Sequence, residues 1–316
     1  MKSDASNIAL FAASVILLGL ISLFPARTGD TNNSTNVFGA VSDSVSAISS
    51  PALEISARSA LATDLTTGDI LFEKNKIETL PLASLTKIIS VLVASDELSS
   101  DGVVRISTSA IATDGTSSLR AGEHLFARDL MAMAMVESSN DAISALMEHA
   151  AAKNDIEPAN AEAWFIQKMR EKAFSLGALT MTFSNATGLD ASKERASNFG
   201  SAEDLMQIAQ RTYASDIWRH SSDQRIVSAE GYVHRLNPTN TLEGEIVQLM
   251  GSKTGFTDIA GGNLLVLFEF PINHPVGIIV LGSTETGRFE DIQKIISYST
   301  DLIRTRLEHT DRNRIQ

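Results

Sequence analysis

The first apolar stretch of the chain runs from Ile8 to Phe24 and contains no charged residue. It has no polar face, which a helix at the surface of a folded domain would show. Its length just suffices to span a bilayer and is long for the core of a signal peptide. Small residues at both −3 and −1 of a cleavage site are missing after it, because Phe24 stands at −3 when Ala26 is at −1. We therefore predict an uncleaved signal anchor over residues 1–26, with a transmembrane helix through 8–24, and keep a cleaved signal peptide as the alternative.

The next stretch, residues 27–51, is rich in Ser, Asn, Thr and Asp and has few large apolar side chains. Such a segment cannot bury enough surface to offset the entropy lost on ordering. We predict a flexible tether here, a folded domain over residues 52–308, and a basic, solvated tail over 309–316.

The folded region begins and ends with strand-like patterns and has helical periodicity in its middle. Strands are predicted at 60–64, 70–73, 246–253, 263–270 and 276–282, a buried helix at 84–94, helices between 127 and 177, and a final helix from about Arg288. The pattern predicts an α/β fold of the α+β type, in which both ends of the region share one sheet flanked by helices. The helical middle then forms a second lobe, with a cleft between the two.

Composition and charge exclude several classes of function. The formal net charge is −12, which disfavours electrostatic binding of the nucleic-acid backbone. The absence of cysteine excludes a thiolate nucleophile, iron–sulfur clusters and Cys-ligated zinc. The six histidines show no close pair at metal-ligand spacing. These patterns predict no metal site.

A Ser-x-x-Lys string, from Ser84 to Lys87, opens the buried helix. Spacing of three places the lysine one turn after the serine on the same face. Serine is a weak nucleophile that needs a neighbouring base, and lysine is a base only when neutral. A shift of a lysine pKa from about 10.4 to near 7 corresponds to roughly 4 kcal/mol. Burial together with a second nearby cation is able to lower the pKa by that amount. The alternative interpretation is a helix-capping serine followed by a solvated lysine.

Two further strings are uninformative when taken singly. Ser138-Ser139-Asn140 lies between two helical segments, and its side chains are able to relay a proton and hold a substrate amide. Lys253-Thr254-Gly255 is predicted at the end of a strand, where it offers a cation, a hydroxyl donor and a glycine that permits close approach to the backbone. It lacks the glycines of a phosphate-binding loop. A solvated strand end is its ordinary interpretation.

The order Ser-x-x-Lys, Ser-x-Asn, Lys-Thr-Gly resembles that of the penicillin-recognising serine acyl-transferases. More closely, the chain resembles the low-molecular-weight penicillin-binding proteins, the serine D-alanyl-D-alanine carboxypeptidases. The resemblance extends to the segments 62–68, 82–87, 176–190, 234–240 and 251–257, and covers about 57–306.

This resemblance implies a β-lactamase/DD-peptidase-like fold and a site that needs neither a metal nor an organic cofactor. Ser84 would attack a peptidoglycan stem peptide ending in D-Ala-D-Ala, with β-lactams as inhibitors and Lys87 as the base. Ser138 would relay the proton to the leaving amine beside Lys253. Asn140 would hold the substrate amide. Thr254, supported by Lys253 and with Gly255 beside it, would bind the terminal carboxylate. The backbone N–H groups of Ser84 and Phe256 would form the oxyanion hole.

Two other functions stay open at this stage. One is a DD-endopeptidase that cleaves peptidoglycan cross-links with the same residues. The other is a catalytically silent wall-binding or β-lactam-sensing module. A β-lactamase is disfavoured, because the string Glu157-Pro158-Ala159-Asn160 has the wrong spacing for a deacylating element. Glu137, next to Ser138, is an acidic side chain without an assigned role. We expect a single-pass location in the cell membrane with the catalytic domain outside the cytoplasm, or secretion if the anchor is cleaved.

Overall fold

The computed structural model describes residues 53–112, 118–218 and 225–314, which belong to a compact unit spanning Ser50–Gln316. The predicted anchor and tether lie outside the described residues. Within the described ranges, no helix combines the length and apolar character needed to cross a membrane.

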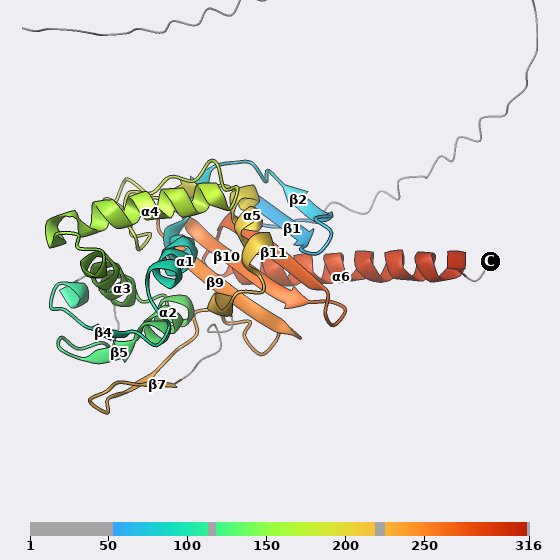
Figure 1. Ribbon diagram of the computed structural model, residues 1–316. Helices are drawn as coiled ribbons and strands as arrows, with labels where there is room; N and C mark the ends of the chain where they lie inside the picture. Colours follow the sequence, from blue (N-terminus) through green and yellow to red (C-terminus); the bar gives the residue numbers. More distant parts are fainter. Residues whose placement is uncertain (1–52, 113–117, 219–224, 315–316) are drawn as a thin grey trace, which may run out of the picture. The chain divides into compact units, whose positions relative to one another are not determined.

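A five-stranded antiparallel sheet forms the centre of the unit (Figure 1). Its order is β2 (Ile70–Lys74), β1 (Ser59–Asp64), β11 (Pro275–Ser283), β10 (Gly261–Glu269) and β9 (Leu249–Thr257). The first strand therefore lies beside the last, and Ala62 is paired with Ile278. The prediction that both ends of the folded region share one sheet is confirmed.

Helices cover both faces of this sheet (Figure 1). Helix α6 (Gly287–Arg314) lies on one face, where Ile292 and Ile295 join Val266 and Ile278 in one apolar core. The neighbouring strand residues Leu265 and Ile279 face the other way, into a larger core shared with the remaining helices. Alternation along each strand thus sorts side chains into two cores, as the two-residue period of a strand requires.

The second lobe is helical and is inserted between β2 and β9. Its helices are α1 (Lys87–Glu97), α2 (Ala127–Val136), α3 (Asn140–Lys153) and α4 (Ala161–Ser175). Helix α5 (Ala202–Thr212) comes from the same segment of the chain but packs on β1 and β11 of the central sheet. Short two-stranded sheets pair β3 (Leu80–Pro81) with β6 (Phe199–Gly200), β4 (Val103–Arg105) with β5 (His124–Phe126), and β7 (Arg225–Val227) with β8 (Val233–Arg235). Helix α1 is buried nearly all round, as its unbroken apolar sequence predicts.

Three boundaries differ from the sequence predictions. The strand expected at 246–253 is Leu249–Thr257, so the Lys-Thr-Gly string lies inside β9 and not at its end. The helix expected at 84–94 begins as a 3₁₀ turn, Ala83–Thr86, before α1 proper. The final helix continues to Arg314, through residues expected to form a tail.

One helix was not predicted at all. Helix α5 begins at a capping box in which Ser201 accepts from the backbone N–H of Asp204 and the Asp204 side chain accepts from Ser201 N. The signal is present in the sequence as Ser-x-x-Asp, with the shorter acid in place of the usual glutamate.

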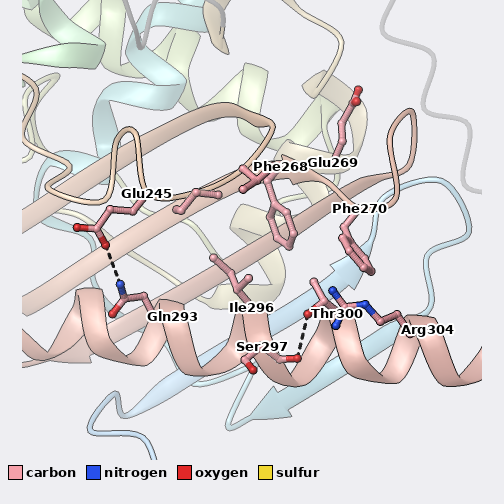
Figure 2. Close-up of a pocket in the computed structure, with 11 residues that line it drawn as sticks. Glu245, Phe268, Glu269, Phe270, Gln293, Ile296, Ser297, Thr300 and Arg304 are labelled. Carbon is pink, nitrogen blue, oxygen red and sulfur yellow. Dashed lines mark hydrogen bonds between the residues drawn. The ribbon is translucent and has the colours of Figure 1, made fainter.

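A groove of about 440 Å³ lies between α6 and the sheet (Figure 2). Phe268, Phe270 and Ile296 give it an apolar floor, and Glu245 and Arg304 stand at its rim. It contains none of the candidate site residues, so it is separate from the chemistry considered below.

Candidate active site

The Ser-x-x-Lys string places a hydroxyl beside an amine at the start of α1. Lys87 Nζ lies 3.0 Å from Ser84 Oγ and donates to the carbonyl of Thr187 at 2.7 Å. Ala83, just before the nucleophile, has a φ of 47°, a left-handed conformation that is strained for a residue with a side chain. The backbone thus turns sharply where Ser84 is presented.

Lys87 is fully buried, with 0% of its surface exposed. Burial lowers the pKa of its amine to about 7, because the charged form loses its hydration. The neutral amine can accept the Ser84 proton while it still donates to Thr187. This depression has the size that the sequence argument required, and burial is its first cause.

The loop whose Thr187 carbonyl accepts the Lys87 hydrogen bond contains a glycine, Gly188, at a position where a larger residue does not fit. Gly188 has a φ of +85°, and a Cβ added there would lie 2.0 Å from the carbonyl oxygen of Ala83. The backbone of this loop therefore lies against the nucleophile turn, as glycine alone permits. Asn198 fixes the same loop by accepting from Ser184 N at 2.8 Å.

Across from this pair, the second and third strings meet. Lys253 Nζ donates to Ser138 Oγ at 2.9 Å and to the carbonyl of Thr254 at 2.8 Å. Ser138 joins α2 to α3 with a φ of 63°, a second strained non-glycine residue in the site. Burial lowers the pKa of Lys253 well below its usual value, and the positive charges of Lys87 and Arg288 lower it further.

Strand β9 runs against the nucleophile turn. A Cβ added at Gly255 would lie 3.1 Å from Ser84 N and 3.0 Å from the carbonyl oxygen of Leu82. Glycine at this position therefore lets the strand approach the Ser84 backbone, where an oxyanion hole is predicted. Phe256 follows with a side chain that is 40% exposed.

The structure thus brings Ser84, Lys87, Ser138 and Lys253 together, with Gly255 alongside. Asn140 is the first residue of α3, two positions after Ser138. Thr254 is buried, and its Oγ1 lies 2.6 Å from Oγ1 of Thr239. The catalytic and binding roles assigned to these residues from the resemblance remain predictions.

Arg288, in the first turn of α6, had no role in the sequence analysis. Its guanidinium is buried and donates to the carbonyl of Gly255 at 2.8 Å, while its Nε is buried and has no hydrogen-bond partner among the described residues. A cation at the positive end of a helix dipole is unfavourable, so an arginine here was an available signal of a special function.

Glu137 is half-buried at the end of α2 and does not simply face solvent. Its Oε1 accepts from the backbone N–H of Asn237 at 3.2 Å. Burial raises the pKa of the Glu137 carboxyl, an effect that Asn237 N and His234 partly oppose. The carboxylate is therefore engaged with the loop between β8 and β9.

Within the described ranges, no group of three or more His, Asp or Glu side chains is arranged to hold a metal ion.

The chain is similar to several characterised proteins. A D-alanyl-D-alanine endopeptidase of Pseudomonas aeruginosa is 29% identical over 236 residues, which are 72% of each chain. The D-alanyl-D-alanine carboxypeptidase DacF of Bacillus subtilis is 26% identical over 261 residues, which are 77% of this chain and 62% of DacF. Penicillin-binding protein D2 of Listeria monocytogenes, in its ampicillin-bound form, superposes with a TM-score of 0.62 at 28% identity, covering 79% of this chain and 99% of that one.

The likeness to a whole family is broader than any of these pairs. The D-alanyl-D-alanine carboxypeptidase family of serine peptidases (Peptidase_S11) matches residues 44–284, well over half of the chain. The match contains all three strings and the loop at Gly188. The chain belongs to the D-alanyl-D-alanine carboxypeptidase family.

Proposed function

We propose that this protein is a serine D-Ala-D-Ala carboxypeptidase that trims peptidoglycan stem peptides and is acylated by β-lactams at Ser84. The contact that carries the proposal is the 3.0 Å approach of the buried Lys87 amine, with its pKa near 7, to the Ser84 hydroxyl. A serine activated by a neutral amine is suited to acyl transfer without a metal.

The first half-reaction forms an acyl-enzyme. Lys87 takes the Ser84 proton as Oγ attacks the carbonyl carbon of the penultimate D-alanine. Negative charge develops on the carbonyl oxygen, and the backbone N–H groups of Ser84 and Phe256 would stabilise it, each donor contributing roughly 10²–10³ in rate. The C–N bond then breaks, and the proton that Lys87 took passes through the Ser138 hydroxyl, which Lys253 contacts at 2.9 Å, to the leaving D-alanine amine. Lys87 is then neutral again.

The second half-reaction releases the shortened peptide. Water gives a proton to Lys87 and attacks the ester carbonyl carbon. The bond to Ser84 Oγ breaks, Oγ recovers its proton, and the peptide leaves as a carboxylic acid. The same amine therefore acts as base in both halves.

The terminal carboxylate of the substrate is placed at Thr254, beside the buried guanidinium of Arg288. Arg288 donates to the carbonyl of Gly255 at 2.8 Å, and its Nε has no hydrogen-bond partner in the part of the chain that the structure describes. A buried guanidinium attracts a carboxylate far more strongly than an exposed one, because little solvent screens it. This end of the site would select peptides with a free C-terminus.

The test is a comparison of two peptidoglycan fragments. We expect release of D-alanine from a monomeric pentapeptide to be faster, by about 10-fold or more in kcat/KM, than cleavage of a cross-linked dimer. Free D-alanine and the two monomers formed from the dimer are quantified by chromatography.

The reverse preference would favour the second candidate, a DD-endopeptidase. The observation behind that candidate is the similarity to the Pseudomonas aeruginosa endopeptidase, at 29% identity over 72% of both chains. Turnover of neither fragment would contradict both activities.

We also propose that residues 8–24 hold the protein in the cell membrane with the domain that begins near residue 52 outside the cytoplasm. The support is the uncharged apolar run and the peptidoglycan substrate, which is extracytoplasmic. We expect the membrane-extracted protein to have the mass of the full chain. A mature N-terminus near residue 27, found by intact mass, would instead show a cleaved signal peptide.

A further inference from the structure

The loop between β8 and β9 joins the two lobes at the site. Its residue Thr239 donates from both backbone N and Oγ1 to the carbonyl of Val136, at 3.1 and 3.2 Å. Val136 ends α2, two residues before Ser138. On its other side, Thr239 Oγ1 lies 2.6 Å from Thr254 Oγ1 on β9.

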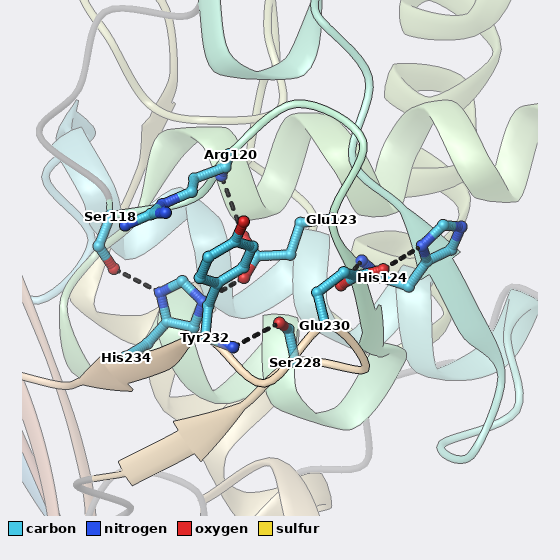
Figure 3. Close-up of polar contacts among 8 residues, drawn as sticks. All are labelled: Ser118, Arg120, Glu123, His124, Ser228, Glu230, Tyr232 and His234. Atoms are coloured by element: carbon cyan, nitrogen blue, oxygen red, sulfur yellow. Dashed lines mark hydrogen bonds and ion pairs between the residues drawn. The ribbon is translucent and has the colours of Figure 1, made fainter.

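The chain is held by hydrogen bonds on both sides of Thr239. Asn240 donates from Nδ2 to Ser252 Oγ on β9 at 2.9 Å. Before the loop, the buried His234 ring lies 2.7 Å from Glu123 Oε1 and 2.7 Å from Ser118 Oγ (Figure 3). Because the flanking residues are held by side-chain hydrogen bonds, the Thr239 hydroxyl has a defined position.

Counting protons shows what this hydroxyl can do. When Thr239 donates to Val136, Thr254 must supply the proton of the 2.6 Å contact and has none left for a ligand. When Thr239 donates to Thr254 instead, the Thr254 proton is free. Val136 keeps the Thr239 N–H as its donor in either arrangement, so no buried carbonyl loses its partner.

A carboxylate accepts hydrogen bonds and donates none. Its arrival beside Thr254 selects the second arrangement, in which Thr239 donates to Thr254 and Thr254 donates to the ligand. Hydroxyls linked in this way polarise one another and strengthen the outer bond.

We infer that Thr239 is a positioning residue for the carboxylate site: it turns the Thr254 hydroxyl toward the free C-terminus of the substrate and donates to it in the bound state. The inference rests on the proposed function. It adds a residue outside the three strings to the selection of substrates by their terminal carboxylate.

The test compares a peptide ending in D-Ala-D-Ala with its C-terminal amide, using the full chain and measuring kcat/KM for each. Thr239→Val keeps the shape and removes the hydroxyl. We expect it to lower kcat/KM for the acid by about 3- to 10-fold, the loss of roughly one hydrogen bond. The amide should change less than about 2-fold, so the acid-to-amide ratio falls.

Two variants serve as controls. Thr239→Ser restores the hydroxyl and should restore the ratio. Thr305→Val removes an exposed hydroxyl that bonds only to the carbonyl of Asp301 in its own helix, and it should leave the ratio unchanged. In a Thr254→Val background, Thr239→Val should have no further effect on the ratio, because the relay is already cut.

Equal losses on acid and amide would show that Thr239 only supports the loop and would overturn the inference. The inference would also be overturned if the double variant lowered the acid-to-amide ratio by the product of the two single effects. If Thr239→Val does not fold, Thr239→Ser still tests the inference. An acid-to-amide ratio below the wild-type value in Thr239→Ser would overturn it. Wild-type protein that cleaves neither peptide contradicts the proposed function itself, which distinguishes that failure from failure of the relay.

Discussion

Replacing Ser84 by alanine is expected to abolish the covalent adduct with benzylpenicillin and to lower peptidase turnover by about 10⁶-fold, the order found when a catalytic serine is removed. The reason is that Oγ of Ser84 is the atom that forms the ester, and among the described residues the Lys87 amine is hydrogen-bonded to no other hydroxyl. Intact mass of the full chain after incubation with penicillin measures the adduct, and D-alanine release measures turnover.

Ser175→Ala is a suitable control, because Ser175 is exposed and donates only to the carbonyl of Lys172. It should be acylated like the wild type. An adduct of equal yield in Ser84→Ala would place the nucleophile elsewhere. Rapid loss of penicillin by the wild type without any adduct would indicate β-lactamase-like turnover in place of a stable acyl-enzyme.

The sheet could be predicted because its strands carry strong apolar patterns and lie at the two ends of the folded region. The pairing of Ala62 with Ile278 realises this expectation. The bounds of β9 could not be predicted correctly, because Gly251, Ser252 and Gly255 interrupt its apolar pattern. These small residues are explained by tertiary contacts: a Cβ at Gly251 would lie 2.9 Å from Trp218 Cβ, and one at Gly255 would lie 3.0 Å from Leu82 O.

The candidate site also has a part that could be predicted from the sequence and a part that could not. Ser84 and Lys87 are one helical turn apart, so local spacing alone predicts their contact. Arg288 and Thr239 reach the site only through the packing of α6 and of the β8–β9 loop on β9, which no local spacing encodes. Residues recruited by long-range packing are therefore the ones that sequence motifs miss.

The strained residues of the site were also beyond sequence reasoning. Ala83 and Ser138 both have positive φ, at 47° and 63°, although neither is a glycine. Such conformations cost on the order of 1–3 kcal/mol each and persist where the surroundings enforce them. Ala83 directly precedes Ser84, and Ser138 is the proposed proton relay. The strained backbone therefore determines how the side chains of these two serines are oriented in the site.

Lys87→Arg is expected to slow acylation by penicillin about 10²- to 10⁴-fold at neutral pH, the usual contribution of a general base. A guanidinium keeps the positive charge but cannot become neutral in a protein, so it cannot take the Ser84 proton. In the wild type, the pKa of Lys87 is lowered to about 7 by burial, and the neutral form is the active one. Acylation should therefore rise with pH up to about 7 and level off above it.

The pH profile separates a base from a merely structural cation. Below the pKa, each pH unit lowers the neutral fraction about tenfold, so wild-type acylation at pH 5 should be roughly 100-fold below the plateau. Lys87→Arg should lack this rise. Lys172→Arg, which alters a partly exposed lysine that is paired with Asp96 on the surface, should keep both the rate and the profile. Wild-type rates in Lys87→Arg would exclude Lys87 as the base and would direct attention to Lys253, the other buried amine at the site.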